Sequence, residues 1–409
     1  MMAADNVRTL PHRTVSVRLP FSKSISNRLL LLRAFSKGKV TVNGLSDATD
    51  TVRLQRLLEQ HSSSYDAGDG GTTLRFLLPY LAMNGSECTL AGNERMNRRP
   101  VRELVDALRS LGANILYVAA EGYPPLHILP AEIRGGAVNV DTSRSSQFAS
   151  ALMLAAPFIC GGLTLRFSGT RVSDSYVDMT LRVLAAAGVE FIVEDSGVRI
   201  PQQQLPETEF DVELDWSSAA FWYQLVALRQ ECSLLLTGLR TGSFQGDESV
   251  SKHFSRLGVV TTPTAEGIRI DSNVPSEMSV PLEFDLRSTP DLAPALIVAC
   301  FGRRIPAVFT GIEHLRYKES DRMAVLLKYL SAMGARVVHA GGRFELQSFP
   351  DQFPSFTVDP HEDHRIAMAF AILSCLHGGV KVSHPEVVRK SYPEFWDQLA
   401  ACGFTGIAT

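Results

Sequence analysis

Along the chain, a hydroxyl-rich, charged or otherwise polar cluster precedes a helical stretch rich in alanine and leucine, and this pattern occurs six times. The clusters begin at Ser24, Gly71, Ser145, Ser217, Ser288 and Asp363. A hydroxyl or carboxylate before an apolar run is typical of a helix N-terminus, because the side chain can cap free backbone N–H groups. Since these helices are apolar almost all round, we expect them to be buried beneath sheets.

Each repeat also carries a second, amphipathic helix that usually ends in glycine. These helices are predicted at residues 51–60, 100–112, 176–188, 248–258, 320–334 and 393–403. In the helix at 100–112, Leu104, Ala107, Leu108 and Leu111 recur at the spacing of one helical face, and Gly112 supplies the stop. One side of each such helix should pack on the core while the other meets solvent.

Short β-branched or alternating runs lie between the helices and predict strands. Examples are residues 39–42, 163–167, 234–237, 308–310 and 380–382. From the second cluster onward the clusters are about 72 residues apart, and a fixed period indicates a repeated supersecondary unit. The sequence therefore predicts a mixed α/β (α+β) fold of six β-α-β-α-β-β-like units.

The first interval of the repeat is short. Ser26 and Thr72 are separated by about 46 residues, so the first unit lacks roughly 25 residues that the other units have. We interpret the difference as a missing strand pair after Gln60.

The length predicts two domains. A chain of 409 residues exceeds the size at which one core usually keeps growing, so we expect three units in each domain. The predicted hinges are the segment before Phe21 and the polar, proline-containing stretch 201–215. This places one domain at residues 21–212 and the second at 1–20 plus 213–409. We expect the helix starts to face the interdomain cleft and form the active site there.

Composition narrows the class of protein. Hydrophobic residues make up 45% of the chain, charged residues 20%, and the net charge is −3, which excludes a disordered chain and argues against a nucleic-acid partner. The six cysteines lie far apart without a C-x-x-C motif, which favours a reducing, cytoplasmic compartment. No apolar run approaches 18 residues and residues 1–13 lack an apolar core, so we expect no membrane span and no signal peptide.

Basic residues nevertheless gather at helix starts and in the loops beside them. They are Lys23, Arg28, Arg75, Arg99, Lys318, Arg322, Arg365 and Lys390. A cation in a first helical turn opposes the helix dipole by about 0.3–1 kcal/mol, a conflict that makes sense if an anion fills the site. Guanidinium groups fit phosphate and carboxylate, so the pattern predicts anionic ligands. The alternative is surface lysines and arginines on ordinary capped helices.

In their order and context these residues resemble the 5-enolpyruvylshikimate-3-phosphate synthases nearly end to end. The motifs are Lys23-Ser24-Ile25-Ser26-Asn27-Arg28, Gly71-Thr72, Arg99-Pro100, Ser145-Ser146-Gln147, Ser173 with Tyr176, Gln245-Gly246-Asp247, Pro290-Asp291, Lys318-Glu319-Ser320-Asp321-Arg322, Asp363-His364-Arg365 and Lys390. The resemblance implies a two-domain inside-out α/β prism that closes over shikimate 3-phosphate and phosphoenolpyruvate. It also implies transfer of the enolpyruvyl (1-carboxyvinyl) group to the 5-hydroxyl of shikimate 3-phosphate with release of phosphate. That is a step of the shikimate pathway to chorismate and the aromatic amino acids.

The resemblance also assigns the site. Shikimate 3-phosphate is expected at Lys23, Ser24, Arg28, Ser145, Ser146, Gln147, Ser173, Tyr176, Asp291 and Lys318. Phosphoenolpyruvate is expected at Lys23, Gly71, Arg99, Gln147, Arg322, Arg365 and Lys390. Glyphosate, the family's phosphoenolpyruvate-competitive inhibitor, should bind there too, with Gly71 leaving it room.

The chemistry implied by the resemblance is addition and elimination through a tetrahedral intermediate, with no metal or organic cofactor. Asp291 is the candidate base for the attacking hydroxyl, and Glu319 with Lys23 is the candidate acid that protonates the methylene carbon. We expect a monomer.

Several of these residues have simpler interpretations. Glu319 and Arg322 are three apart and fit an intrahelical ion pair, while Asp291 after Pro290 fits a helix cap. Arg75 fits a role in holding the neighbouring loop, and we leave it out of the site. The stretch His361-Glu362-Asp363-His364 lacks a third metal ligand at matching spacing, so no metal site is predicted.

Two positions depart from the family pattern. Asp69 stands where asparagine is common, which puts a carboxylate near the expected phosphate of phosphoenolpyruvate. His314 replaces an asparagine that helps hold the phosphate of shikimate 3-phosphate in many relatives.

Two other functions stay open at this point. The sister enolpyruvyl transferase acting on UDP-N-acetylglucosamine has Lys-Asn where this chain has Lys23-Ser24, and usually a reactive cysteine in a mobile loop. Residues 93–99 of this chain contain no cysteine. The other alternative is a catalytically inactive anion-binding relative, against which Lys23, Asp291 and Glu319 argue.

Overall fold

The computed structural model describes residues 14–143, 145–169, 172–229, 232–273 and 280–407, so the stretch at 1–13 discussed for a signal peptide lies outside the described residues. The chain divides into two compact units. We call Phe21–Glu213 the N-unit, and Met1–Pro20 with Leu214–Thr409 the C-unit. The chain therefore passes between the units twice, at Pro20 and after Glu213.

The N-unit contains six α-helices and three sheets among its described residues. The helices are α1 (Lys23–Phe35), α2 (Thr49–Glu59), α3 (Gly71–Met83), α4 (Arg102–Ser110), α5 (Ser146–Ala155) and α6 (Asp174–Ala186), with the 3₁₀ turns η1 (Met96–Arg98) and η2 (Ala156–Phe158). One sheet has the order β3 (Ser64–Asp66), β4 (Cys88–Ala91), β6 (Leu126–Leu129), β5 (Asn114–Tyr117). Another has the order β7 (Arg134–Asp141), β8 (Cys160–Ser168), β10 (Gly197–Ile200), β9 (Ile192–Glu194), and the third pairs β2 (Val40–Asn43) with β11 (Thr208–Asp211).

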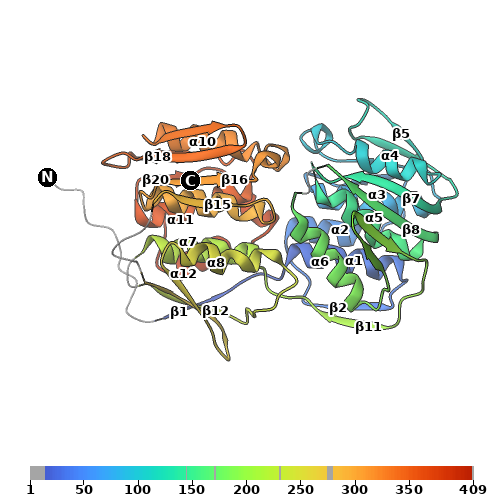
Figure 1. Cartoon of the computed structure of the whole chain (residues 1–409), viewed down its shortest axis with the longest axis horizontal. Coiled ribbons are helices and arrows are strands. Elements are labelled where there is room, and N and C mark those ends of the chain that lie inside the picture. The colour runs from blue at the N-terminus through green and yellow to red at the C-terminus, as the bar shows by residue number, and fades with distance from the viewer. Residues whose placement is uncertain (1–13, 144, 170–171, 230–231, 274–279, 408–409) are drawn as a thin grey trace. The chain divides into compact units, whose positions relative to one another are not determined.

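The C-unit is built in the same way (Figure 1). Its described helices are α7 (Trp216–Leu228), α8 (Val250–Ser255), α9 (Ala293–Gly302), α10 (Arg322–Ala332), α11 (His364–Leu376) and α12 (Phe395–Ala401), with η3 (Gly246–Ser249), η4 (Pro290–Leu292), η5 (Glu313–Tyr317) and η6 (Pro385–Lys390). Its sheets have the orders β1 (Val15–Arg18), β12 (Ser233–Thr237), β14 (Gly267–Ser272), β13 (Val259–Pro263), and β15 (Leu282–Asp285), β16 (Ala307–Thr310), β18 (Arg343–Ser348), β17 (Arg336–Ala340). The third pairs β19 (Phe356–Val358) with β20 (Val380–Val382).

The four-stranded sheets share one plan, which the β15 sheet illustrates. β15 and β16 pair in parallel and are joined through the buried helix α9, and β16 then pairs antiparallel with one strand of the hairpin β17–β18. Phe284 lies opposite Phe309 across the parallel pair, and their rings stack at 5.3 Å. A parallel pair needs a long crossover whereas an antiparallel pair needs only a turn, so each unit reads β-α-β-α-β-β. The predicted mixed α/β fold is confirmed.

Two units are short rather than one. After α2 the next described strand is β3, which already belongs to the following sheet, so the strand pair predicted to be missing after Gln60 is indeed missing. Among the described residues, the sheet of β19 and β20 also has no hairpin. There the carbonyl of Ile407 accepts the N–H of Val382, so a single C-terminal segment borders β20 instead of a hairpin.

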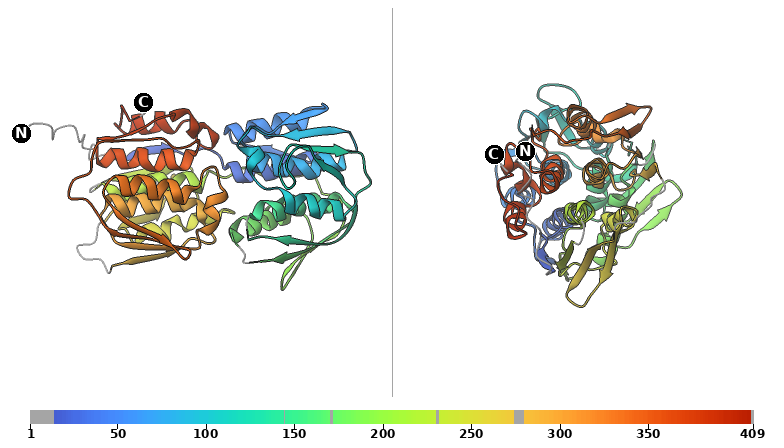
Figure 2. Two further views of the ribbon diagram at one scale, coloured as in Figure 1. Left: turned by 90° about the horizontal axis from the view of Figure 1, so that it is seen from above. Right: turned by 90° about the vertical axis from the view of Figure 1, so that its left-hand side faces the viewer.

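Buried helices fill the interior of each unit. In the N-unit α1, α3 and α5 pack pairwise, and in the C-unit α7, α9 and α11 do the same. Figure 2 shows helices inside each unit and strands toward its outside. Every residue of α7 is buried, as expected for a helix that is apolar all round. The polar residues at the N-termini of these helices therefore differ from the apolar residues that make up the rest of each core.

Candidate active site

The start of α1 places Lys23 against a carboxylate. Ser22 is extended and its Oγ accepts the N–H of Ile25 at 3.5 Å, so α1 begins at Lys23 as the serine-rich sequence predicts. The Nζ of Lys23 lies 3.1 Å from Oδ2 of Asp50, a buried residue in the first turn of α2. The cation opposes the dipole of its own helix but is balanced by its neighbour.

The start of α3 packs against a buried guanidinium. A Cβ on Gly71 would lie 2.6 Å from Nη1 of Arg99, so only glycine lets the Arg99 side chain lie there. Arg99 is 9% exposed, and its Nε has no hydrogen-bond partner among the described residues. A guanidinium beside the free N–H groups of a helix N-terminus is an arrangement that binds anions.

Arg75 and Gln147 connect the N-terminus of α3 to α5. Arg75 donates to Oε1 of Gln147 at 2.6 Å and to the carbonyl of Pro100 at 3.1 Å, and Gln147 donates to Oγ1 of Thr72 at 2.9 Å. Ser145 caps α5 by accepting the N–H of Gln147 at 3.3 Å. The expected role of Arg75 in holding the Arg99-Pro100 loop is therefore confirmed.

Arg28 joins α1 to α6 inside the N-unit. It is 2% exposed, and it donates to the hydroxyl of Thr180 at 2.8 Å, to the carbonyl of Ser24 at 2.8 Å and to the carbonyl of Tyr176 at 3.1 Å. Burial lowers the pKa of Arg28 to about 10, so the group stays charged at neutral pH. Ser173, at the N-cap of α6, is buried and has a left-handed backbone with φ of 58°.

These contacts bring most of the predicted N-unit residues to one place. Hydrogen bonds link the starts of α1, α2, α3 and α5 through Lys23, Asp50, Thr73, Thr72 and Gln147. The hydroxyl of Thr73, in α3, links this helix to α2 by donating to the carbonyl of Asp50 at 3.1 Å. The N-unit therefore carries one continuous cluster of helix starts.

In the C-unit, Arg322 at the start of α10 binds three carboxylates. Its Nε lies 2.8 Å from Asp363, its Nη1 2.9 Å from Asp291 and its Nη2 2.8 Å from Glu319. Burial alone would lower the pKa of Arg322, but the three carboxylates raise it above its ordinary value. The ion pair of Glu319 with Arg322 exists, although Glu319 precedes α10 and the pair is not intrahelical.

Asp291 lies at the centre of this cluster. Besides Arg322, its carboxylate contacts Nζ of Lys318 at 3.4 Å and Nη2 of Arg365 at 3.0 Å. Burial raises the pKa of Asp291, but the charges of Arg365, Lys318 and Arg322 outweigh it and hold the pKa well below its ordinary value. The interpretation of Asp291 as a helix cap is wrong, because Thr289 occupies that position of η4.

Asp363, at the start of α11, and Lys390, at the end of η6, are two further buried charged groups of the C-unit. Asp363 is fully buried, caps α11 by accepting the N–H of Arg365 at 3.0 Å, and accepts the hydroxyl of Ser320 at 3.0 Å. Its oxygens thus serve a guanidinium and a helix cap, and among the described residues no group of three or more His, Cys, Asp or Glu could hold a metal. Lys390 is buried at the end of η6, which packs against α11.

His314 is a neutral group in this environment. It lies in η5 and is 4% exposed. Burial, together with the charge of Lys318, lowers the pKa of His314 to about 3. At neutral pH the imidazole is therefore uncharged, like the side-chain amide of asparagine.

Sequence reasoning missed the carboxylates that pair with the cations. Asp50, in the first turn of α2, received no role, and Asp363 was predicted only as a helix start and not as a partner of Arg322. The available signal was charge balance, since a cation held in a core needs a counter-charge nearby.

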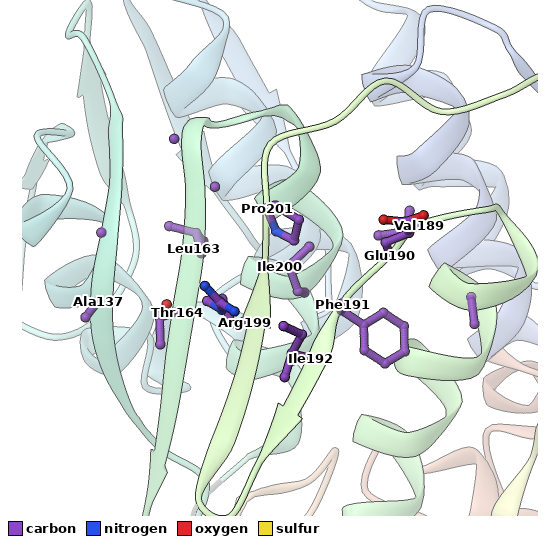
Figure 3. A pocket seen from close by; sticks show the side chains of 14 residues that line it. Ala137, Leu163, Thr164, Val189, Glu190, Phe191, Ile192, Arg199, Ile200 and Pro201 are labelled. Carbon is purple, nitrogen blue, oxygen red and sulfur yellow. The ribbon is translucent and has the colours of Figure 1, made fainter.

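A separate hollow of the N-unit lies away from these residues. It has a volume of about 880 Å³ and is lined by β7, β8, β10 and the segment after α6. Figure 3 shows Thr164, Ile192, Arg199 and Ile200 around it. None of the predicted site residues lines it, so the candidate site rests on the helix starts.

The cysteines and the helix lengths bear on the predicted compartment. All six cysteines are free thiols, and five of them are buried. Across the described part of the chain, none of the helices has both the length and the apolar character that crossing a bilayer requires.

Comparison with known proteins now decides the family. The profile of EPSP synthase (3-phosphoshikimate 1-carboxyvinyltransferase) matches residues 52–399. The 3-phosphoshikimate 1-carboxyvinyltransferase of Bacteroides fragilis is 38% identical over 399 residues and covers 95% of each chain. The chain belongs to the EPSP synthase family. Its activity is accordingly that of a 3-phosphoshikimate 1-carboxyvinyltransferase, EC 2.5.1.19, as the sequence predicts.

More distant EPSP synthases agree. The 3-phosphoshikimate 1-carboxyvinyltransferase of Methanosphaerula palustris is 33% identical, covering 94% of this chain and 96% of the relative. The solved structure of EPSP synthase from Acinetobacter baumannii covers 97% of this chain and 96% of its own, with a TM-score of 0.71 and 22% identity. The enolpyruvyl transferase NikO from Streptomyces tendae gives a TM-score of 0.71 at 14% identity, so the fold extends beyond EPSP synthases.

Proposed function

We propose that the two clusters of helix starts are the two halves of one active site, which joins shikimate 3-phosphate to phosphoenolpyruvate. The single observation that carries the proposal is that each unit gathers buried cations at or beside helix starts, Arg99 in the N-unit and Arg322 and Arg365 in the C-unit. Both ligands are multiply anionic, and a like-charge pair about 4 Å apart costs roughly 4 kcal/mol at an effective dielectric near 20. Cations from both units are needed to offset that repulsion.

Shikimate 3-phosphate binds mainly to the N-unit in this proposal. Its ligands are Lys23, Ser24, Arg28, Ser145, Ser146, Gln147, Ser173 and Tyr176, with Asp291 and Lys318 from the C-unit. Arg28 supports this role because it is charged, buried and already bonded to the backbone of Tyr176. Neutral His314 takes the place of the family's asparagine, since burial keeps its ring uncharged.

Phosphoenolpyruvate binds between the basic groups of both units. Its ligands are Lys23, Gly71, Arg99 and Gln147 from the N-unit and Arg322, Arg365 and Lys390 from the C-unit. The N-terminus of α3 supports this role, because Arg99 lies against Gly71 and its Nε is unpaired among the described residues.

The chemistry follows from the Asp291 cluster. Asp291 accepts the proton of the 5-hydroxyl while that oxygen attacks C2 of phosphoenolpyruvate, and Glu319 with Lys23 delivers a proton to C3. Glu319 then takes a proton back from the new methyl group as phosphate departs, which restores the carbon–carbon double bond and gives the enol ether. Anionic substrates bound to Lys318, Arg322 and Arg365 neutralise the charges that lower the pKa of Asp291, so binding makes this carboxylate a better base.

In this proposal the protein acts as a monomer in the cytoplasm. It needs no metal or organic cofactor, because positioning and charge stabilisation supply the acceleration. Closure of the two units over the ligands excludes water from the reacting groups.

A phosphate-release assay tests this function. Phosphoenolpyruvate with shikimate 3-phosphate should give stoichiometric phosphate, and either substrate alone should give none. UDP-N-acetylglucosamine in place of shikimate 3-phosphate should also give none. Absence of release with both proposed substrates would leave only an anion-binding protein.

A further inference from the structure

The motif Gln245-Gly246-Asp247 has no role in the chemistry above, yet it is built into the same end of the C-unit. Gln245 anchors it to α7, because Oε1 accepts the N–H of Trp216 at 3.0 Å and Nε2 donates to the carbonyl of Leu214 at 2.8 Å. The turns η3, which contains Asp247, and η4, which contains Asp291, both pack against α7. The motif thereby brings one more carboxylate to the Asp291 cluster.

Asp247 is buried and only half satisfied. It is 3% exposed, and the hydroxyl of Ser217 donates to its Oδ2. Its Oδ1 has no hydrogen-bond partner among the described residues. A buried carboxylate oxygen without a donor is costly while it is ionised, and this cost falls when the group is protonated.

η3 packs against α7 and α8, and three charged groups act on Asp247. They are Asp291 on η4, Arg365 on α11 and Asp215 at the cap of α7. Its neighbour on η3, Glu248, instead accepts the N–H groups of Gly242 and Ser243. Burial and the charge of Asp291 raise the pKa of Asp247 to about 6, against the opposing effects of Arg365 and Ser217.

We propose that Asp247 is a positioning residue of the transfer reaction, which frees Arg365 for phosphoenolpyruvate by taking up a proton as that anion binds. This inference rests on the proposed function, because it requires phosphoenolpyruvate at Arg365. Arg365 is already paired with Asp291 at 3.0 Å, and ionised Asp247 adds a second negative charge that acts on Arg365 and repels the incoming anion. An anion at Arg365 cancels the charge that opposes protonation of Asp247, so binding and proton uptake favour each other.

The test is the pH profile of kcat/KM for phosphoenolpyruvate at saturating shikimate 3-phosphate, compared between the wild type and Asp247→Asn. Asparagine mimics the protonated group, and dividing wild type by variant cancels the titration of the substrate itself. The ratio should be about one near pH 5.5 and fall roughly tenfold by pH 8, because kcat/KM for phosphoenolpyruvate reports groups of the enzyme form to which it binds, here the complex with shikimate 3-phosphate. The change should lie in KM, with kcat altered less.

Two further variants make the result specific. Asp271→Asn, at an exposed pair with Arg269 on β14, removes the same charge and should follow the wild type at all pH values. Ser217→Ala removes the hydroxyl that favours ionised Asp247, so its fall in kcat/KM should move to higher pH. This variant also decides the matter if Asp247→Asn fails to fold.

The outcomes separate the inference from the function on which it rests. No phosphate release by the wild type at any pH would remove the proposed function. Normal release with a ratio that is constant across pH, or with Ser217→Ala superimposed on the wild type, would leave that function intact and overturn the role of Asp247.

Discussion

The carboxylate of Asp291 contacts three cations, so its environment is built for a negative charge. Replacing it with asparagine keeps the shape and removes both the charge and the base. Asp291→Asn should lower kcat by about 10³-fold, within the range typical of a lost general base. Binding of shikimate 3-phosphate, measured by calorimetry, should persist because most of its proposed ligands are in the N-unit. Near-normal turnover would remove Asp291 as the base.

Asp247 makes a pH-dependent contribution to stability that differs in sign from that of an ordinary salt-bridged carboxylate. Its folded pKa is raised from 3.8 to about 6, so wild-type stability falls as pH rises between these values and the loss is complete above them. Asp247→Asn should therefore increase the free energy of unfolding by on the order of 1–3 kcal/mol at pH 8, with little change at pH 4. Urea denaturation at both pH values measures this. An equal change at both would show that Asp247 does not titrate in this range.

At the scale of elements, the start of α3 depends on the absence of one side chain. Alanine in a helix usually stabilises a protein relative to glycine by about 0.4–1 kcal/mol. At Gly71 the new methyl group would meet Arg99 at 2.6 Å and displace its guanidinium. Gly71→Ala should raise KM for phosphoenolpyruvate at least tenfold. Gly378→Ala, in open space, is the matched control and should leave KM unchanged.

The start of α10 depends on buried charge pairing. Asp363→Asn leaves Arg322 with one carboxylate fewer in a site that is 1% exposed. Removing one partner of a buried ion pair typically costs 3–5 kcal/mol, so Asp363→Asn should lower the free energy of unfolding by about that amount. The exposed pair of Glu94 and Arg98 provides the contrast, and Glu94→Gln should change the free energy of unfolding by less than about 1 kcal/mol. Similar losses in both variants would contradict the structural role of Asp363.

Helix starts could be predicted from the sequence because their signals are local. Ser22, Ser145 and Asp363 cap α1, α5 and α11 with hydrogen bonds that reach only two or three residues along the chain. The family resemblance extended these local signals to a set of ligands. The short first unit was also predictable, because a missing strand pair changes the spacing of the repeat.

The partners of the charged groups could not be predicted in this way. Lys23 and Asp50 are 27 residues apart, and Asp291 and Arg365 are 74 apart, so each contact depends on how two helices pack. For the same reason, the sequence predicted no role for Asp247 in the motif Gln245-Gly246-Asp247. Its distinctive property, a buried oxygen without a donor, exists only in the folded C-unit.

At the scale of the whole molecule, the proposed active site requires that one pair of ligands contacts both units. The N–H groups in the first turn of a helix have no partner within that helix, so they exchange readily until an anion binds them. Amides near the starts of α1 and α3 belong to the N-unit, and amides near the starts of α10 and α11 belong to the C-unit. Ligands held between the units should protect both sets together.

Hydrogen exchange with and without shikimate 3-phosphate and phosphoenolpyruvate therefore tests the central claim most directly. The catalytically impaired Asp291→Asn variant slows turnover about a thousandfold, so both substrates persist over short exchange times. The account predicts that slower exchange appears in peptides covering 23–28 and 71–75 and equally in peptides covering 319–324 and 363–366. Protection confined to one unit would contradict a shared active site.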